Sequence, residues 1–272
     1  MARVLRRRLA GITPLNCHAQ RQSPLFSVLP PELRNQIFEL AVSQYDDLSR
    51  PYRENAYWYR PGHHYEPRTD TRLLRTCRLV YYETCVIPMR SATHHVYFEH
   101  GISVPNYFFH FARKEQENIY HLHIFTNFRQ YELRFIQNLL TGLRLHWKRI
   151  TMTVRTTDWL TWDDGGSARD MEKNLKTLIL PDSCKEFVLE FEAPATRKTE
   201  RDQRISGAAT WEFKAQSGAV FTTEASRIAI STWTGSADIN GVHWGVHSPG
   251  TTIEYHVSKL TWRPSRSIYR AE

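Results

Sequence analysis

Leu29–Val42 has the sequence LPPELRNQIFELAV, and this stretch decides how the N-terminal part of the chain is expected to fold. Pro30 and Pro31 fix the backbone angle φ and supply no N–H group, so they suit the entrance of a helix. Glu32 follows in the first turn, where a carboxylate meets the positive end of the helix dipole. The stretch therefore predicts a helix of about three turns that begins at the two prolines.

Apolar side chains recur along this helix at helical spacing, and two more widen the stripe: Leu33, Ile37, Leu40 and Ala41, with Phe38 and Val42. The polar residues fall on the other side: Arg34, Asn35, Gln36 and Glu39. Such an amphipathic helix either packs into the core of its own domain or offers its apolar side to a partner. The pattern alone leaves both interpretations open.

The longer segment SPLFSVLPPELRNQIFELAV resembles the opening of an F-box, and more closely the start of a large group of mostly uncharacterised fungal proteins with a degenerate F-box-like start. Those proteins continue, after a variable insert, with a helix and a strand similar to LLRTCRLVYYETCVIPMRSATHHVYFE, which is Leu73–Glu99 here. In true F-box proteins the helix after LPxEL binds the Skp-type adaptor of a cullin–RING ubiquitin ligase. The remainder of such a chain binds a protein substrate.

The resemblance implies a partner-binding patch made of Leu29, Pro30, Leu33, Ile37 and Phe38. One departure from the F-box pattern is the polar, aromatic segment Gln44–Asp70, which separates the first helix from the LLRTCR segment. Its prolines and Gly62 predict a long insert loop. If the helix packs inward against the second expected helix, Thr71–Ile87, which Asp70 would cap, no adaptor surface remains.

Composition places the chain among globular proteins with room for one large domain or two small ones, since it has 272 residues with 41% hydrophobic and 24% charged residues. No apolar run reaches the length of a membrane span, and the arginine-rich start lacks the apolar core of a secretory signal. Four scattered cysteines predict free thiols in a reducing compartment. We therefore expect a cytoplasmic or nuclear protein.

The net charge of +8 raises the alternative of a nucleic-acid-associated protein. Five positive charges precede Pro31 with no acidic residue among them, so without this tail the net charge is about +3. The alternative uses the basic tail together with the insert, whose tyrosines, tryptophan and arginines could clamp a single strand. Packing of those aromatics back onto the domain is the competing interpretation.

The rest of the chain predicts an α+β or irregular α/β protein. Strands at Val96–Phe98, Ile119–Phe125, Ile150–Val154 and Phe187–Phe191 alternate with helices at 107–117, Tyr131–Trp147 and Ala168–Leu180, which is typical of βα units. This predicts an irregular arc loosely like a leucine-rich repeat. A period of two from about Ala208 to Trp262 predicts an antiparallel sheet.

The expected division of the chain is as follows: 1–22, a disordered basic tail; 23–100, an F-box-like helical segment with the insert loop 44–70; 101–192, βα units; 193–204, a linker; 205–264, an antiparallel β region; and 265–272, a tail.

Motifs for catalysis and for cofactor binding are absent from the sequence, so we expect no enzyme activity and no cofactor. His121 and His123 share one face of an expected strand, yet no Cys or His motif with zinc spacing accompanies them, so a half-exposed strand is the simpler explanation. Asp163–Gly166 predicts a turn, because it lacks the alternating ligands of a calcium loop. No metal site is therefore expected.

Overall fold

The computed structural model describes residues 8–98, 102–103, 108, 111, 113–126, 130–143, 145–155, 172–223, 228–239, 242–243 and 250–265. Its internal contacts divide the chain into two compact units. The helical unit comprises Met1–Asp47 and Pro67–Ala92, and the sheet unit comprises Leu48–Glu66 and Thr93–Glu272. The expected division at 193–204 is wrong, because both sides of that segment belong to the sheet unit.

Short helices build the helical unit: η1 (Pro14–Asn16), α2 (Pro24–Ser27), α3 (Pro31–Val42), η2 (Arg72–Arg75), α4 (Arg78–Thr84) and α5 (Ile87–Ser91). The expected helix after the prolines is confirmed as α3, with Glu32 in its first turn. Residues 8–22, expected as a disordered tail, instead have defined local structure. The Asn16 carboxamide accepts a hydrogen bond from the Thr13 N–H at 2.9 Å and donates one to the Gly11 carbonyl at 2.7 Å.

The second helical segment is broken, although a continuous helix was expected over Thr71–Ile87. Asp70 was expected as the cap, but the N-cap of η2 is Thr71; the Asp70 carboxylate accepts the Arg72 N–H at 2.9 Å from one residue earlier, and η2 ends after one turn. Cys77 then takes an extended conformation with φ of −155°, and its thiol accepts the Val80 N–H at 3.5 Å to start α4. Pro88 lies in the first turn of α5, where its missing N–H breaks no helical hydrogen bond.

The segment expected as an insert loop contains a strand pair, β1 (Gln44–Pro51) and β2 (Tyr65–Thr69). At the end of the pair the Tyr52 N–H donates to the His64 carbonyl at 2.8 Å. Ion pairs join the strands: Arg50 with Glu66 at 2.9 Å and Arg68 with Asp47 at 3.0 Å. We name residues 48–66 the hairpin tip; they belong to the sheet unit.

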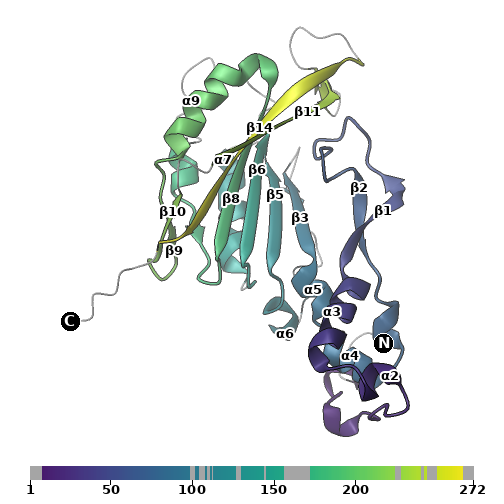
Figure 1. The fold of residues 1–272 in the computed structure, drawn as a ribbon. Coiled ribbons are helices and arrows are strands. Elements are labelled where there is room, and N and C mark those ends of the chain that lie inside the picture. The colour runs from purple at the N-terminus through teal and green to yellow at the C-terminus, as the bar shows by residue number, and fades with distance from the viewer. Residues whose placement is uncertain are drawn as a thin grey trace, which may run out of the picture. The chain divides into compact units, whose positions relative to one another are not determined.

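Strands of the sheet unit form one ten-stranded sheet in the described part of the chain, in the order β4-β3-β5-β6-β8-β14-β10-β9-β7, with β11 also paired to β14 (Figure 1). The bounds are β3 (Thr93–Phe98), β4 (Ile102–Ser103), β5 (His121–Thr126), β6 (Arg149–Arg155), β7 (Ile179–Leu180), β8 (Glu186–Pro194), β9 (Phe213–Ala215), β10 (Val220–Thr223), β11 (Ala229–Ser236) and β14 (Thr252–Pro264). A separate pair is formed by β12 (Asp238–Ile239) and β13 (Val242–His243).

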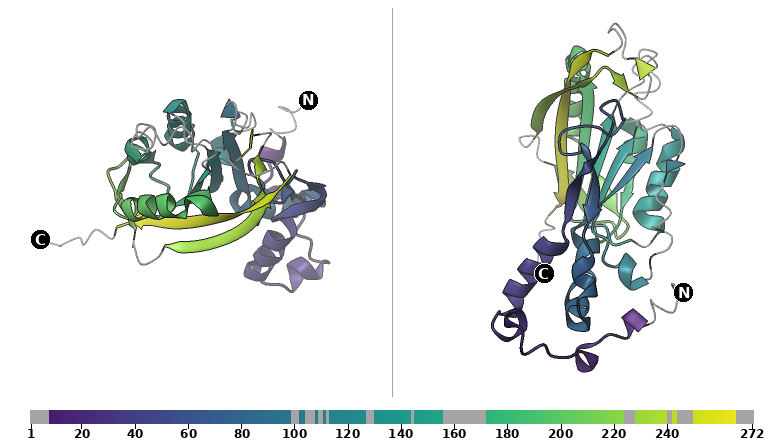
Figure 2. Two further views of the ribbon diagram at one scale, coloured as in Figure 1. Left: turned by 90° about the horizontal axis from the view of Figure 1, so that it is seen from above. Right: turned by 90° about the vertical axis from the view of Figure 1, so that its right-hand side faces the viewer.

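The parallel strands confirm the expected βα units, since β3, β5, β6 and β8 run parallel in register. The C-terminal strands are antiparallel, as expected, but they are no separate region. β14 pairs with β8 from Tyr255 opposite Pro194 to Trp262 opposite Phe187. Its other edge carries β11, which forms the outer border of the sheet there (left panel of Figure 2). The chain is thus a mixed α/β protein with one dominant sheet.

Alternation along the parallel strands sends one set of side chains to the main core, as strand geometry requires. Leu122 and Ile124 of β5, Met152 of β6 and Leu189 of β8 are buried there. The same core contains the apolar residues of α7 (Gln130–Gln137), of the π-helical turn Asn138–Gly142 and of α9 (Lys198–Ala208): Ile136, Leu139, Leu140, Ile205 and Ala208. Helices therefore cover this face of the sheet.

One predicted helix and one predicted linker differ from the structure. The helix expected over Tyr131–Trp147 ends with the π-helical turn, and Trp147 is instead a buried residue whose Nε1 donates to the Leu139 carbonyl at 3.0 Å. The segment 193–204, expected as a linker, runs from the end of β8 through η6 (Ala195–Arg197) into α9. The helix expected at 107–117 is described in part, as α6 (Arg113–Gln116), and the one expected at 168–180 gives way to β7 at Ile179. The expected turn 163–166 lies outside the described residues, as do residues 107, 109–110, 112 and 168–171 of these helices.

Because β14 completes the main core, we predict that Leu260→Ala lowers the free energy of unfolding by about 2–5 kcal/mol. Leu260 is 1% exposed in the main core. Ile230→Ala on β11 serves as the control, since Ile230 is 63% exposed and its loss is expected to change stability by less than about 0.5 kcal/mol. Urea unfolding followed by tryptophan fluorescence measures both. A separate early transition in Leu260→Ala would contradict a sheet unit that folds as one body.

Candidate functional site

The inward side of α3 holds the helix in its unit. Phe38 and Val42 are 1% and 0% exposed, and they pack in a small core with Val80 of α4 and Ile87 of α5. The partly buried residues around this core are Leu25, Phe26, Leu73, Leu74 and Cys77. Phe38 was expected in the partner-binding patch, and this assignment is wrong because the ring is already enclosed by its own unit.

An ion pair fixes the rotation of α3 about its axis. Arg34 donates from Nε and from its second terminal nitrogen to the two carboxylate oxygens of Glu83, at 3.3 and 3.2 Å. Its first terminal nitrogen donates to the Leu29 carbonyl at 2.9 Å, and the guanidinium lies 5.3 Å from the centre of the Phe26 ring. Because a planar guanidinium binds a carboxylate in one orientation, this pair directs the Arg34 side of α3 toward α4.

The outward side of α3 is apolar and faces solvent. Leu33 and Ile37 are 46% and 44% exposed, and Leu40 is 80% exposed. These residues follow one another at intervals of four and three, so they form one continuous stripe. Of the other predicted patch residues, Pro30 is exposed and Leu29 is half-buried. The structure therefore brings Leu33, Ile37 and Leu40 together on an open surface, which we name the docking stripe.

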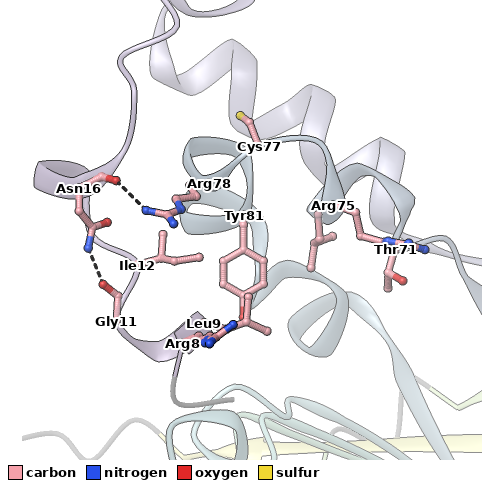
Figure 3. A pocket seen from close by; sticks show the side chains of 11 residues that line it. Arg8, Leu9, Gly11, Ile12, Asn16, Thr71, Arg75, Cys77, Arg78 and Tyr81 are labelled. Atoms are coloured by element: carbon pink, nitrogen blue, oxygen red, sulfur yellow. Dashed lines mark hydrogen bonds between the residues drawn. The ribbon is translucent and has the colours of Figure 1, made fainter. Parts of the chain in front are cut away.

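A pocket of about 920 Å³ also lies in the helical unit, between residues 8–16 and residues 71–81 (Figure 3). Figure 3 shows the Tyr81 ring at the centre of the lining residues, with Ile12 to one side and Arg8 and Leu9 at its outer end. Arg78 lies near Asn16, whose carbonyl accepts a hydrogen bond from it at 3.5 Å. The sequence pattern of the tail gives no signal of this pocket, because its walls come from two segments, residues 8–16 and 71–81, that are far apart in the chain.

The hairpin tip packs onto the face of the sheet opposite the helices through buried charges. Arg60 forms ion pairs with Glu192 and, at 3.7 Å, with Glu190. Arg155 lies 2.6 Å from the second oxygen of Glu192 and donates to the Tyr57 carbonyl. The Glu192 side chain is fully buried between the two guanidinium groups. Burial of charge is tolerated here because each charge has an opposite partner.

This packing disfavours the insert as a nucleic-acid clamp. Tyr57 is 2% exposed and Arg60 is 7% exposed, while Arg50 and Arg68 are both ion-paired within the strand pair. A clamp needs aromatic faces and cations that are open to bases and phosphates. Tyr57 and Arg60 are thus packed back onto the domain, whereas Arg50 and Arg68 keep largely exposed side chains.

Histidines line the same face of the sheet beside the buried charges. The ring centres of His63 and His95 lie 4.5 Å apart, and those of His95 and His123 lie 5.6 Å apart. His63 shares a hydrogen bond of 2.8 Å with the Tyr97 hydroxyl, and His123 shares one of 2.9 Å with Thr153. Burial lowers the pKa of His63 to about 4 and that of His95 to about 3, and it lowers the pKa of His123 well below 6.5.

These rings are a structural cluster rather than a ligand set. His63 and His123 each have a ring nitrogen engaged with a hydroxyl group, and the rings lie side by side on the sheet. Within the described residues, no group of three or more metal-ligating side chains is placed to hold an ion. His121 lies on the same strand face as His123 but remains outside this cluster of ring contacts.

No family model, curated protein or solved structure matches this chain. Within the described residues, no helix has the length and apolar character needed to cross a membrane. In the described part of the chain, the docking stripe and the pocket of the helical unit are two surfaces open to a partner or ligand.

We predict that stability falls as pH is lowered from 7 to 5, because the unfolded histidines bind protons near pH 6.5 while the buried ones stay neutral. Folded-state pKa values below the unfolded value mean that the unfolded chain binds more protons in this window. Each of His63, His95 and His123 then contributes a loss on the order of 1–2 kcal/mol by pH 5. Urea unfolding at several pH values measures this dependence.

The variant His95→Phe keeps an aromatic ring in the cluster and removes one titrating group. The number of protons taken up on unfolding is therefore expected to fall by about one, and the unfolding free energy to vary less steeply with pH. His146→Gln is the control, since His146 is exposed and lies outside the cluster. Identical pH profiles for His95→Phe and the wild type would contradict the buried neutral state.

Proposed function

We propose that this chain is a non-enzymatic protein-interaction module that binds a partner through the docking stripe of α3. The proposed partner is the Skp-type adaptor of a cullin–RING ubiquitin ligase, and the chain would then be its substrate-recognition subunit. The observation that supports this is the division of α3 into two apolar sides. Phe38 and Val42 are enclosed, whereas Leu33, Ile37 and Leu40 remain open to solvent.

The geometry of the stripe suits a helix bound in an apolar groove. Anchors at positions i, i+4 and i+7 are the pattern that such a groove accepts, and they stand on a helix already held by the Arg34–Glu83 ion pair. A partner therefore meets a preformed surface, and the helix loses little conformational entropy on binding. Docking is therefore more favourable here than it would be for a helix that first had to detach from its core.

The size of the stripe sets the extent of the interface. Three aliphatic side chains that are partly exposed contribute about 3–6 kcal/mol on burial, whereas a micromolar complex needs about 8 kcal/mol. The partner must therefore also contact neighbouring residues. Pro30 is exposed, and Val28 is 74% exposed just before the helix, so both extend the apolar surface that a partner can cover.

The F-box-like character of the first helices is part of this proposal, and so is the loose likeness of the βα units to a leucine-rich-repeat arc. The sheet unit would provide the surface for a protein substrate. We also propose a cytoplasmic or nuclear location, where the adaptor and the ligase act. In this proposal the strand pair β1–β2 and the hairpin tip would correspond to the variable insert of the resembling proteins.

Isothermal titration with a purified Skp-type adaptor tests the proposal. Leu33→Asp and Ile37→Asp are each expected to weaken binding by about tenfold or more, because a carboxylate cannot be buried unpaired in an apolar groove. Asn35→Asp is the matched control, since it adds the same charge to an exposed polar position of the same helix. Its affinity is expected to remain within about twofold of the wild type.

Circular dichroism and thermal unfolding of each variant separate docking from folding. Both aspartate variants are expected to fold, since Leu33 and Ile37 are nearly half exposed. Wild-type protein that does not bind the adaptor, or variants that bind it as tightly as Asn35→Asp does, would contradict the proposal.

A further inference from the structure

We propose that the pocket of the helical unit binds a small organic anion, a phosphate or carboxylate group carried on an apolar or aromatic body. The pocket lies between residues 8–16 and 71–81 and uses none of the residues of the docking stripe. It is therefore independent of the adaptor proposal. Its volume of about 920 Å³ is within the range of about 300–1,000 Å³ found for small-molecule sites.

Charge at the pocket is unbalanced. Three arginines line it, Arg8, Arg75 and Arg78, and no carboxylate does. Three arginines of the helical unit that do not line the pocket have acidic partners: Arg34 with Glu83, Arg68 with Asp47 and Arg72 with Asp70. In the described part of the chain, Arg8 and Arg75 have no ion-pair partner, so these two lining cations are available to a ligand.

The lining between these cations is largely apolar. Tyr81, Leu9, Ile12 and Leu74 contribute to it, and the Tyr81 ring stands at the centre of the lining residues in Figure 3. An aromatic ring in a pocket that arginines also line favours a ligand with a flat or aliphatic body and an anionic end. Inorganic phosphate satisfies only the charged part of such a site. The arginines and the apolar lining together therefore favour an anion with an apolar body over inorganic phosphate.

Local hydrogen bonds hold the wall formed by residues 8–16. Asn16 bonds to Gly11 through its side chain and receives Arg78 at its carbonyl. The Arg78 head group is thereby tied to the wall, while the wall itself is closed into a turn by the Asn16 contact with Thr13. The pocket is thus built before a ligand arrives, which lowers the entropic cost of binding.

The test is titration calorimetry of the full chain with phenyl phosphate, inorganic phosphate and phenol. Phenyl phosphate is expected to bind, and each of the other two probes is expected to bind about tenfold more weakly or not measurably, because each lacks one half of the ligand chemistry. Equal affinity for phenyl phosphate and inorganic phosphate would overturn the proposal, and so would the absence of phenyl phosphate binding.

Charge reversal locates the site. The double variant Arg75→Glu/Arg78→Glu is expected to weaken phenyl phosphate binding by at least about tenfold. Arg8→Glu tests the other side of the pocket in the same way. Arg21→Glu is the control, because Arg21 is exposed in the same unit and does not line the pocket. Equal losses in Arg21→Glu and the double variant would show non-specific charge attraction and overturn the site.

Titration with a phosphotyrosine peptide shows whether the anionic group that binds is part of a protein or of a free small molecule. The pentapeptide Gly-Gly-phosphotyrosine-Gly-Gly with blocked ends carries the phenyl phosphate group on a chain. Binding of this peptide at least as tight as that of phenyl phosphate supports the site with a protein side chain as ligand. Weaker binding of the peptide supports the site with a free small molecule as ligand.

Discussion

The ion pair between Arg34 and Glu83 is the interaction on which the interpretation of the helical unit depends. Helix α3 carries apolar residues on two sides, so hydrophobicity alone does not decide which side is buried. The bidentate contact to Glu83 points the Arg34 side toward α4, and Phe38 and Val42 follow Arg34 at intervals of four on that side. Leu33, Ile37 and Leu40 are left outside as a consequence.

The sheet unit likewise depends on ion pairs, but these lie in its interior. Glu192 lies at the end of β8 and is fully buried, so it requires cations nearby. One is Arg155, from the neighbouring strand, and the other is Arg60, from the hairpin tip. Removal of the tip would leave Glu192 and Arg155 partly unpaired. The tip is therefore a structural part of the sheet unit and a poor candidate for a mobile binding loop.

Several features of the fold could be predicted from the sequence because they follow from the local alternation of apolar and polar residues. Leu122 and Ile124, and likewise Met152 and Val154, alternate with polar residues along buried strands, and the pattern locates β5 and β6. The strand β1 escaped detection because its residues are almost all exposed on both sides and show no alternation. The helix α9 was missed since its sequence is strongly charged and, of its described side chains, only Ile205 and Ala208 reach the core.

The candidate site was predicted in part. Leu33 and Ile37 were correctly placed on one side of a helix, whereas the inward position of Phe38 was not foreseen. That position depends on Arg34 meeting Glu83, a residue 49 positions away, which no local pattern encodes. The pocket was missed for the same reason, because its cations come from segments that only the fold brings together.

Carbene footprinting of the unmodified protein tests the central claim most directly, since it reports the solvent exposure of each side chain along α3. The two-sided helix predicts strong labelling of Leu33, Ile37 and Leu40, with protection of Phe38 and Val42. Addition of the adaptor is then expected to protect the first three residues. Protection of all five in the free protein, or equal labelling of all five, would contradict the claim that α3 holds one apolar side inward and offers the other to a partner.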